Sequence, residues 1–199
     1  MTHVPGRFFP EFQPRRVLAI ISPPFESLGP LVACQHRYVG EVFCSIAGLG
    51  GAATDVALDL LAGGLDPALA TIYRRCDIPE MDRLALLLAA VIGPSLGVGG
   101  FVAAAGILAL QATDVLGGDL DGAARVARSW NGRYPATMFA VPEQVLDVGP
   151  AATDGVLGRR AAWASRLDDV EDVLRFGAWR VRREAGATLE AVREAIAGY

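Results

Sequence analysis

The chain has 199 residues, 52% of them hydrophobic and 20% charged, so it is long and apolar enough to bury one substantial core. Its formal net charge is −4, and its 18 basic residues are all arginine. A net negative chain is a poor default partner for nucleic acid, and a chain without lysine excludes any mechanism that needs a lysine ammonium group or Schiff base.

The first half of the chain alternates short apolar runs with helical patterns. Residues 16–21 are apolar and β-branched, which predicts a buried strand, and residues 22–30 follow as a loop at a sheet edge. Residues 41–48 predict a second strand. Residues 54–64 predict a helix that starts at a Thr54 cap and stops at two glycines.

The same alternation continues through the middle of the chain. Residues 70–75 predict a strand, and residues 79–92 predict a helix with a proline in its first turn. Helices are expected around 101–112 and over 120–134, and a further strand over 138–142. Repeated strand–helix alternation indicates an α/β fold, in which a parallel sheet is covered by helices on both faces.

From about Asp168 onward the pattern is helical, with arginine and glutamate dense on an exposed face. We expect residues 1–167 to form one α/β domain and residues 168–199 to form helices that pack on it. The arginines could contact an anionic partner, but their alternation with glutamate favours a solvated face. Core or interface anchoring is expected, rather than stacking on a cofactor, for Trp130, Trp163 and Trp179.

A charge-free stretch between Leu84 and Gln111 is long enough to span a bilayer. However, residues 93–100 interrupt it with a proline among glycines and a serine, which break a helix rather than cross lipid. The pattern therefore favours a buried hairpin or strand–loop–helix, and no membrane association is expected.

Cysteine and histidine usage offers little chemistry. Cys34, Cys44 and Cys76 are widely spaced, and the chain opens without a signal-like region, so we expect a cytoplasmic protein with reduced thiols. Cys34 and His36 are two residues apart without a third orienting group, which favours ordinary buried thiols over a nucleophile. With only one further histidine, no metal site is predicted, and no cofactor is predicted either.

Several segments, in order, resemble the catalytic domain of tryptophanyl-tRNA synthetase, a class I synthetase with a Rossmann fold. They are "ISPPFESLG", "QHRYVGEVFCSIAGL", "GLDPALATIYRRCDIPEMDRLALLL" and "AAAGILALQATDVLGGDLDGAARVARSWNGRYPATMFAVPE". Together they cover about two-thirds of the chain. The resemblance implies a Rossmann-like parallel sheet covered by helices, with a C-terminal helical segment.

The chain departs from that family where ATP is held. The histidine-containing helix start after the first strand is replaced by "ESLGP", and a lysine-free chain cannot supply the family's mobile lysine loop. Arg159 and Arg160 lie near that loop's place as partial substitutes. The chain also ends short of the family's anticodon-reading helices. The resemblance therefore implies that no aminoacyl-adenylate forms, and tRNA is not an expected partner.

The amino-acid pocket of the family is altered as well. The aspartate that accepts the indole N–H falls at Gly106, and the family's Gly-Glu-Asp-Gln loop is represented by Gly117, Gly118, Asp119 and Leu120. These changes are consistent with a pocket that no longer selects tryptophan in this way. Asp119 and Asp121 could address a ribose or amine, although a helix cap is the favoured interpretation.

Three functions follow. The first is binding or transforming an amino-acid-derived small molecule in specialised biosynthesis. The second is a transferase like the cyclodipeptide synthases, with Ser22 as nucleophile, although no base is in view for it. The third is a pseudoenzyme that acts by binding a partner.

A ligand is expected at the carboxyl edge of the sheet, where helix starts expose unpaired N–H groups, unless the crevice is filled. Glycines there would allow close approach, and Gly106 would leave space. The predicted ligand-binding residues are Ser27, Gly48, Gly106, Gly117, Gly118, Asp119 and Asp121. A homodimer is also expected, with Ile72 to Ile92 contributing to its interface.

Overall fold

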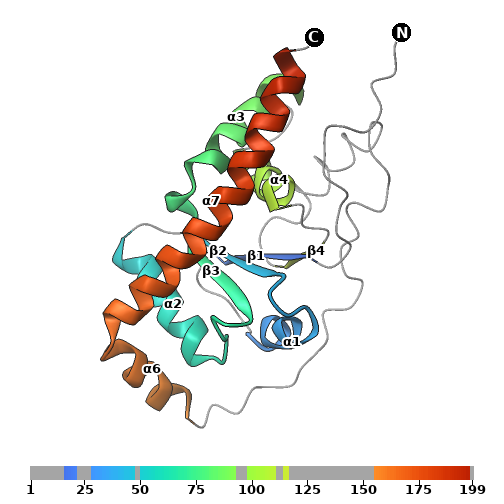
Figure 1. The fold of residues 1–199 in the computed structure, drawn as a ribbon. Helices are drawn as coiled ribbons and strands as arrows, with labels where there is room; N and C mark the ends of the chain where they lie inside the picture. Colours follow the sequence, from blue (N-terminus) through green and yellow to red (C-terminus); the bar gives the residue numbers. More distant parts are fainter. Residues whose placement is uncertain are drawn as a thin grey trace.

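A computed structural model describes residues 16–21, 28–47, 50–92, 98–110, 114–116 and 155–197 (Figure 1). Its strands form one parallel sheet in the order β3-β2-β1-β4. The strands are β1 (Val17–Ile21), β2 (Val42–Ile46), β3 (Ala70–Arg74) and β4 (Asp114–Leu116). A parallel sheet covered by helices confirms the expected Rossmann-like α/β fold.

Helices cover both faces of the sheet. α1 (Gly29–Arg37) and α2 (Gly51–Ala62) lie on one face, and α3 (Pro79–Ile92) and α4 (Val98–Leu110) on the other. A short 3-10 turn, Arg75–Asp77, connects β3 to α3. α6 (Val156–Ala164) packs beside α2, and the long α7 (Leu167–Ala197) crosses in front of β3 towards α3 and α4 (Figure 1). The expected C-terminal helical segment is therefore present.

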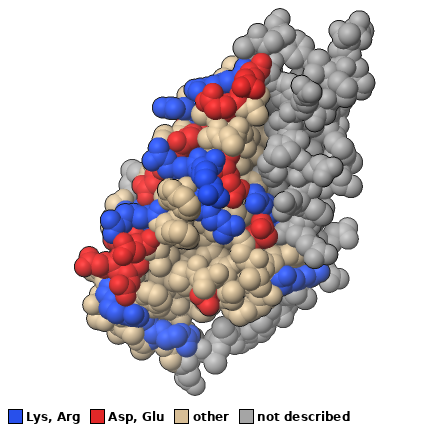
Figure 2. Space-filling view, viewed as in Figure 1, with Lys and Arg blue, Asp and Glu red and all other residues tan. Residues whose placement is uncertain are grey.

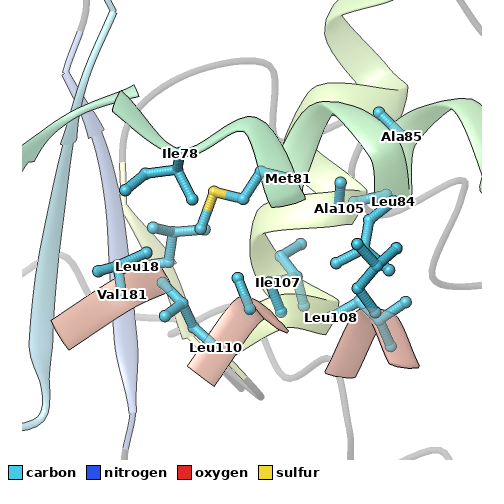
Figure 3. Packing of buried hydrophobic residues seen from close by; sticks show 14 of the residues in the cluster. Leu18, Ile78, Met81, Leu84, Ala85, Ala105, Ile107, Leu108, Leu110 and Val181 are labelled. Atoms are coloured by element: carbon cyan, nitrogen blue, oxygen red, sulfur yellow. The ribbon is translucent and has the colours of Figure 1, made fainter. Parts of the chain in front are cut away.

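Each face of the sheet has its own apolar core because successive strand residues point to opposite sides. On one side, Leu18 and Phe43 join α3, α4 and α7 around Met81 and Leu84, as the close-up in Figure 3 shows in part. On the other side, alternate strand residues pack against α1, α2 and the start of α7. Burial on both faces explains why the strands read as continuous apolar runs in the sequence.

α7 lies directly against β3, the strand at the end of the sheet order. The two backbones lie close together at Gly177, where an added Cβ atom would be 1.9 Å from the backbone oxygen of Ile72. Only glycine fits this contact. α7 therefore covers an edge strand that would otherwise be open to pairing with another chain.

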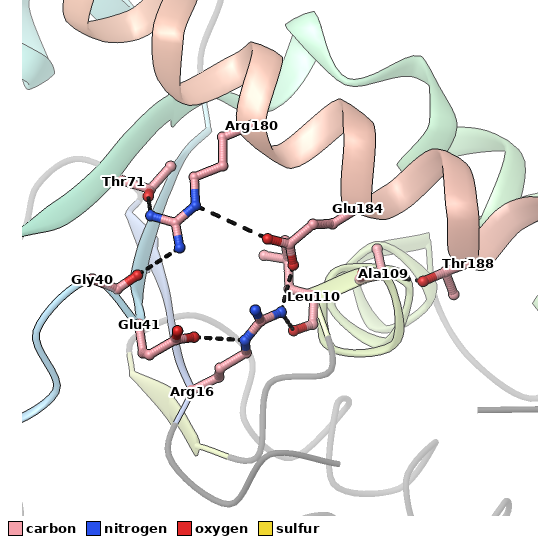
Figure 4. Close-up of polar contacts among 9 residues, drawn as sticks. All are labelled: Arg16, Gly40, Glu41, Thr71, Ala109, Leu110, Arg180, Glu184 and Thr188. Carbon is pink, nitrogen blue, oxygen red and sulfur yellow. Dashed lines mark hydrogen bonds and ion pairs between the residues drawn. The ribbon is translucent and has the colours of Figure 1, made fainter. Parts of the chain in front are cut away.

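A polar network ties α7 to the amino edge of the sheet (Figure 4). Arg16, just before β1, bonds to Glu41 at 2.6 Å and also pairs with Glu184 of α7. Arg180 donates to Thr71 Oγ1 at 2.9 Å and to the Gly40 carbonyl at 2.7 Å. Since these groups join the starts of strands to one helix, the network holds the fold together and is remote from the carboxyl edge.

Several predicted elements are confirmed. The strands over 16–21, 41–48 and 70–75 are present as β1, β2 and β3, and the helix over 79–92 has the bounds expected. The Thr54 cap is wrong: α2 begins three residues earlier after Gly50, and Thr54 Oγ1 instead hydrogen-bonds Glu171 at 3.0 Å. The sequence assigned the Thr54 hydroxyl to the N-terminus of α2, but it instead binds a distant residue on α7.

Other elements were missed. The sequence treated α1, β4 and α6 as loops or left them unassigned. It predicted more than one helix over residues 168–199, whereas α7 runs unbroken through Gly186. Ala185 and Leu189 are buried on either side of that glycine, so packing carries the helix past it. The predicted helix over 120–134 and strand over 138–142 lie outside the described residues.

The charge-free stretch is resolved into parts of two packed helices, α3 and α4. Within the described part of the chain, no helix combines the length and apolar character needed to cross a bilayer.

Candidate functional site

The strand order places a topological switch point at β1 and β4. In open parallel sheets, ligands bind outside the carboxyl ends of the strands at such a point. The loops that follow β1 and β4 hold most of the predicted site. These predicted residues lie outside the described part of the structure: Ser22, Ser27, Gly48, Gly117, Gly118, Asp119 and Asp121.

The described residues beside this edge form a row across three strands. Ile20, Ser45 and Tyr73 are register partners on β1, β2 and β3, so their side chains share one face of the sheet. This is the face that α3, α4 and α7 cover, and Tyr73 belongs to its core. Ser45 and Tyr73 thus place two hydroxyls inside the protein, in the carboxyl-terminal halves of their strands.

The Tyr73 hydroxyl is buried, and the Ser45 hydroxyl is its nearest polar influence among the described residues. Its side chain is fully buried, and among the described residues no group makes a hydrogen bond of normal geometry with Tyr73 Oη. Burial raises the pKa of the phenol far above its ordinary 10.0, and the side-chain hydrogen bond to the Ser45 hydroxyl lowers it in part. Tyr73 is therefore a neutral hydroxyl next to the carboxyl edge, and no described residue satisfies it with a hydrogen bond of normal geometry.

The start of α2 also lies at this edge, directly after β2. Gly50 has a φ of +56°, a conformation that favours glycine, and no side chain caps the helix that starts at Gly51. Gly50 and Gly51 thus lie just after β2, at the carboxyl edge of the sheet.

Gly106 is the one predicted ligand-binding residue that the structure describes. It is buried in α4, and a Cβ atom there would lie 3.0 Å from Leu18 Cδ2 of β1. The space that the sequence expected beside this glycine is occupied by Leu18. A carboxylate at this position would project into an apolar core.

Arg159 and Arg160 have local partners. Arg159 Nε donates to the Ala62 carbonyl at 2.7 Å, and Arg160 Nε bonds Asp59 at 2.6 Å. These contacts hold α6 against the last turns of α2. The two guanidinium groups that could have replaced the family's lysine loop are therefore engaged in packing two helices.

A surface hollow of about 790 Å³ lies between α7 and the β3–α3 connection. It is lined by Arg74, Asp77, Glu80, Arg175, Ala178, Trp179, Arg182 and Arg183. Three of its arginines are in ion pairs: Arg74 with Glu171 and Asp77, Arg175 with Asp172, and Arg182 with Glu80. Because acidic partners already neutralise most of this positive charge, the hollow is a weak anion site.

Cys44 and Cys76 are poorly suited to act as nucleophiles. Burial raises the pKa of the Cys44 thiol far above its ordinary value, and burial together with Asp77 raises the pKa of Cys76. Both shifts oppose formation of a thiolate. Among the residues described, no group of three or more metal-ligating side chains comes together.

Sequence reasoning missed Ser45 and Tyr73 because they lie inside predicted strands rather than in loops. The available signal was the serine in the otherwise apolar run "VFCSI". A strand that is buried on both faces is expected to carry apolar side chains at every position, so a polar residue there is unusual. Their juxtaposition depends on the register between β2 and β3, which a single strand pattern does not provide.

No protein-family model matches the sequence, and no curated protein sequence matches it either. Solved structures do match. The tryptophanyl-tRNA synthetase from Campylobacter jejuni complexed with ADP and tryptophan aligns with a TM-score of 0.65 at 14% identity, over 92% of this chain and 99% of that chain. A second crystal structure of the C. jejuni enzyme gives a TM-score of 0.64 at 14% identity, with the same coverage. The chain thus shares the fold of tryptophanyl-tRNA synthetase.

Proposed function

We propose that this protein binds an amino-acid-derived small molecule at the carboxyl edge of its sheet and does not activate it as an adenylate. Binding is supported by the fold, because a synthetase with this fold was crystallised with tryptophan and ADP. The absence of adenylate formation is supported by the residues of this chain, which has no lysine. We propose that the protein acts in specialised biosynthesis and that tRNA is not its substrate.

The observation that supports ligand binding is the buried Tyr73 hydroxyl, which makes no hydrogen bond of normal geometry with any described residue. A buried hydroxyl without a hydrogen bond costs roughly 1–3 kcal/mol, and a ligand group that pairs with it recovers this free energy. The Ser45 hydroxyl lies on the same face one strand away. Together they suit a ligand that brings both a donor and an acceptor, such as an amide or a carboxyl group.

The loss of adenylation is supported by two features of the chain. Adenylate formation develops negative charge on a triphosphate, which fixed cations stabilise in the transition state. This chain has no lysine, and Arg159 and Arg160 are bonded to α2. The indole-selective carboxylate is also replaced at Gly106, where Leu18 fills the neighbouring space.

A ligand screen tests the proposal. The probes are L-tryptophan, L-tryptophanamide, indole-3-acetate and a panel of cyclic and linear dipeptides, measured by thermal shift and then by calorimetry. Tyr73→Phe removes only the hydroxyl, so we expect it to fold normally and to bind a hit about tenfold or more weakly. Leu86→Ser, on the exposed side of α3, is the matched control that should bind as the parent protein does.

Two results would overturn this proposal. One is equal affinity of the parent protein and Tyr73→Phe for every hit, which would remove the hydroxyl from the site. The other is no binding of any probe at millimolar concentration, which would leave partner binding as the better account of the protein.

A further inference from the structure

The hollow between α7 and the β3–α3 connection has two sides of different charge. One stripe of α7 supplies five lining residues at helical spacing, which are Arg175, Ala178, Trp179, Arg182 and Arg183. The β3–α3 connection supplies the other three, which are Arg74, Asp77 and Glu80. Because Arg74 is already paired with Glu171 and Asp77, the α7 side is the basic side of the hollow and Glu80 makes the opposite side acidic.

One carboxylate oxygen of Glu80 is buried without a donor. Glu80 Oε1 accepts from Nε and Nη2 of Arg182, both at 3.3 Å, which is longer than a normal charge-assisted hydrogen bond. Glu80 Oε2 has no hydrogen-bond partner among the described residues. A buried carboxylate oxygen in this state is stabilised by any donor that reaches it, and a positively charged donor stabilises it most.

Arg183 provides the complementary group on the α7 side. Its guanidinium lies over the Trp179 ring, 5.1 Å from the ring centroid, and it forms no ion pair with another described residue. Stacking occupies the flat face of a guanidinium but leaves the N–H groups along its edge free to donate. The Trp179 ring therefore orients Arg183 so that it can hold a carboxylate through two parallel hydrogen bonds.

The mixed charge of the lining disfavours a ligand with charge of only one sign. A simple anion would meet the carboxylates of Asp77 and Glu80, and a simple cation would meet the guanidinium groups of α7. Figure 2 likewise shows basic and acidic side chains next to one another along α7. A zwitterion satisfies both sides, because its ammonium group pairs with Glu80 and its carboxylate with Arg183.

We propose that this hollow binds a zwitterion of amino-acid or dipeptide size that carries an apolar side chain. Its volume of about 790 Å³ lies within the range of small-molecule sites. Ala178 and the part of the Trp179 ring that stays exposed give the ligand's side chain an apolar surface. The hollow shares no residue with the row of Ser45 and Tyr73, so this proposal is independent of the proposed function.

Calorimetric titration with L-phenylalanine and two analogues tests the charge requirement. Phenethylamine lacks the carboxylate, and 3-phenylpropionate lacks the ammonium group. We expect L-phenylalanine to bind with a Kd of about 0.1–1 mM, and each analogue to bind about tenfold or more weakly. The dipeptide L-phenylalanyl-L-alanine separates the two sources of such a zwitterion, because the tighter binder of the two identifies either a free amino acid or a peptide as the ligand.

Two variants locate the ligand. Glu80→Gln keeps the shape of the side chain and removes its charge, and Arg183→Gln removes the guanidinium from an exposed position. Each variant should weaken the binding of L-phenylalanine about tenfold or more. Arg193→Gln is the matched control on the same helix, because Arg193 lies outside the hollow and pairs only with the exposed Glu190 among the described residues, and it should bind as the parent protein does.

Three results would overturn this proposal. The first is no binding of L-phenylalanine or the dipeptide at about 10 mM, a concentration well above the expected Kd. The second is equal binding of L-phenylalanine and its two analogues. The third is loss of binding in Tyr73→Phe with normal binding in Glu80→Gln and Arg183→Gln, which would place the ligand at the sheet edge. Thermal melting of each variant confirms that lost binding is not lost folding.

Discussion

The contact between α7 and β3 can be tested with two glycines of the same helix. At Gly177 an added Cβ atom would lie 1.9 Å from the Ile72 carbonyl oxygen and 2.8 Å from its carbon. Backbone atoms cannot turn aside, so Gly177→Ala must displace α7 by about 1.5 Å to reach normal contact distance. Such a shift opens the packing of Leu174 and Val181, both of which are buried.

The expected magnitude follows from two opposing terms. Overpacking of a close-fitting site costs roughly 1–3 kcal/mol and more where backbone must move, while alanine gains about 1 kcal/mol over glycine in a helix. Because a whole helix must shift, the overpacking cost lies at or above the top of that range, so we expect Gly177→Ala to lower the free energy of unfolding by about 2 kcal/mol or more. Gly186→Ala, where the added Cβ atom meets open space, should instead raise it by roughly 0.5–1 kcal/mol.

Urea denaturation followed by circular dichroism measures both variants against the parent protein, at a concentration low enough to keep the chain monomeric. Similar stability changes of the two variants would refute the reasoning, because only the contact with β3 distinguishes the two sites. In thermal melts the difference should amount to several degrees for a chain of this size.

Three further outcomes are expected from the buried groups. Tyr73→Phe should raise the free energy of unfolding of the unliganded protein by roughly 1 kcal/mol in chemical denaturation, because it removes an unsatisfied hydroxyl; a loss of that size would mean that the hydroxyl has a partner. Gly106→Asp should lower it by about 3 kcal/mol or more in the same assay, since it buries an unpaired carboxylate against Leu18; a stable variant would indicate an open, hydrated site. Cys44 and Tyr73 have folded pKa values raised above their ordinary 9.0 and 10.0, so both stay protonated in the folded state and ionise on unfolding. Below pH 9 these two groups contribute their full share of the free energy of unfolding. At higher pH that free energy falls by up to about 1.4 kcal/mol per pH unit for each group, once the pH exceeds the group's ordinary pKa. Tyr73→Phe should therefore make the loss of stability at alkaline pH less steep.

The sequence predicted the parts of the fold that local patterns control. β1, β2 and β3 were recognisable because burial on both faces requires continuous apolar runs. α3 was recognisable from Pro79 in its first turn and from acidic residues that follow it. The resemblance to a synthetase catalytic domain is borne out by the fold, although the comparison rests on structure at 14% identity.

Other features depend on contacts that no local pattern encodes. α1 has no strong apolar stripe, and its buried Gln35 is satisfied by the backbone of Gly64 and Asp66 some thirty residues away. The sequence around Gly177 does not distinguish it from other helix glycines, because its role depends on contact with β3. For the same reason, the row of Ser45 and Tyr73 becomes visible only once the register of the strands is known.

The most direct test of the account is exchange of radiolabelled pyrophosphate into ATP in the presence of L-tryptophan, with a tryptophanyl-tRNA synthetase as positive control. We expect no tryptophan-dependent exchange above the enzyme-free background, because the chain has no lysine and its Arg159 and Arg160 hold α6 to α2. Exchange at a rate comparable with that of the control synthetase would contradict it.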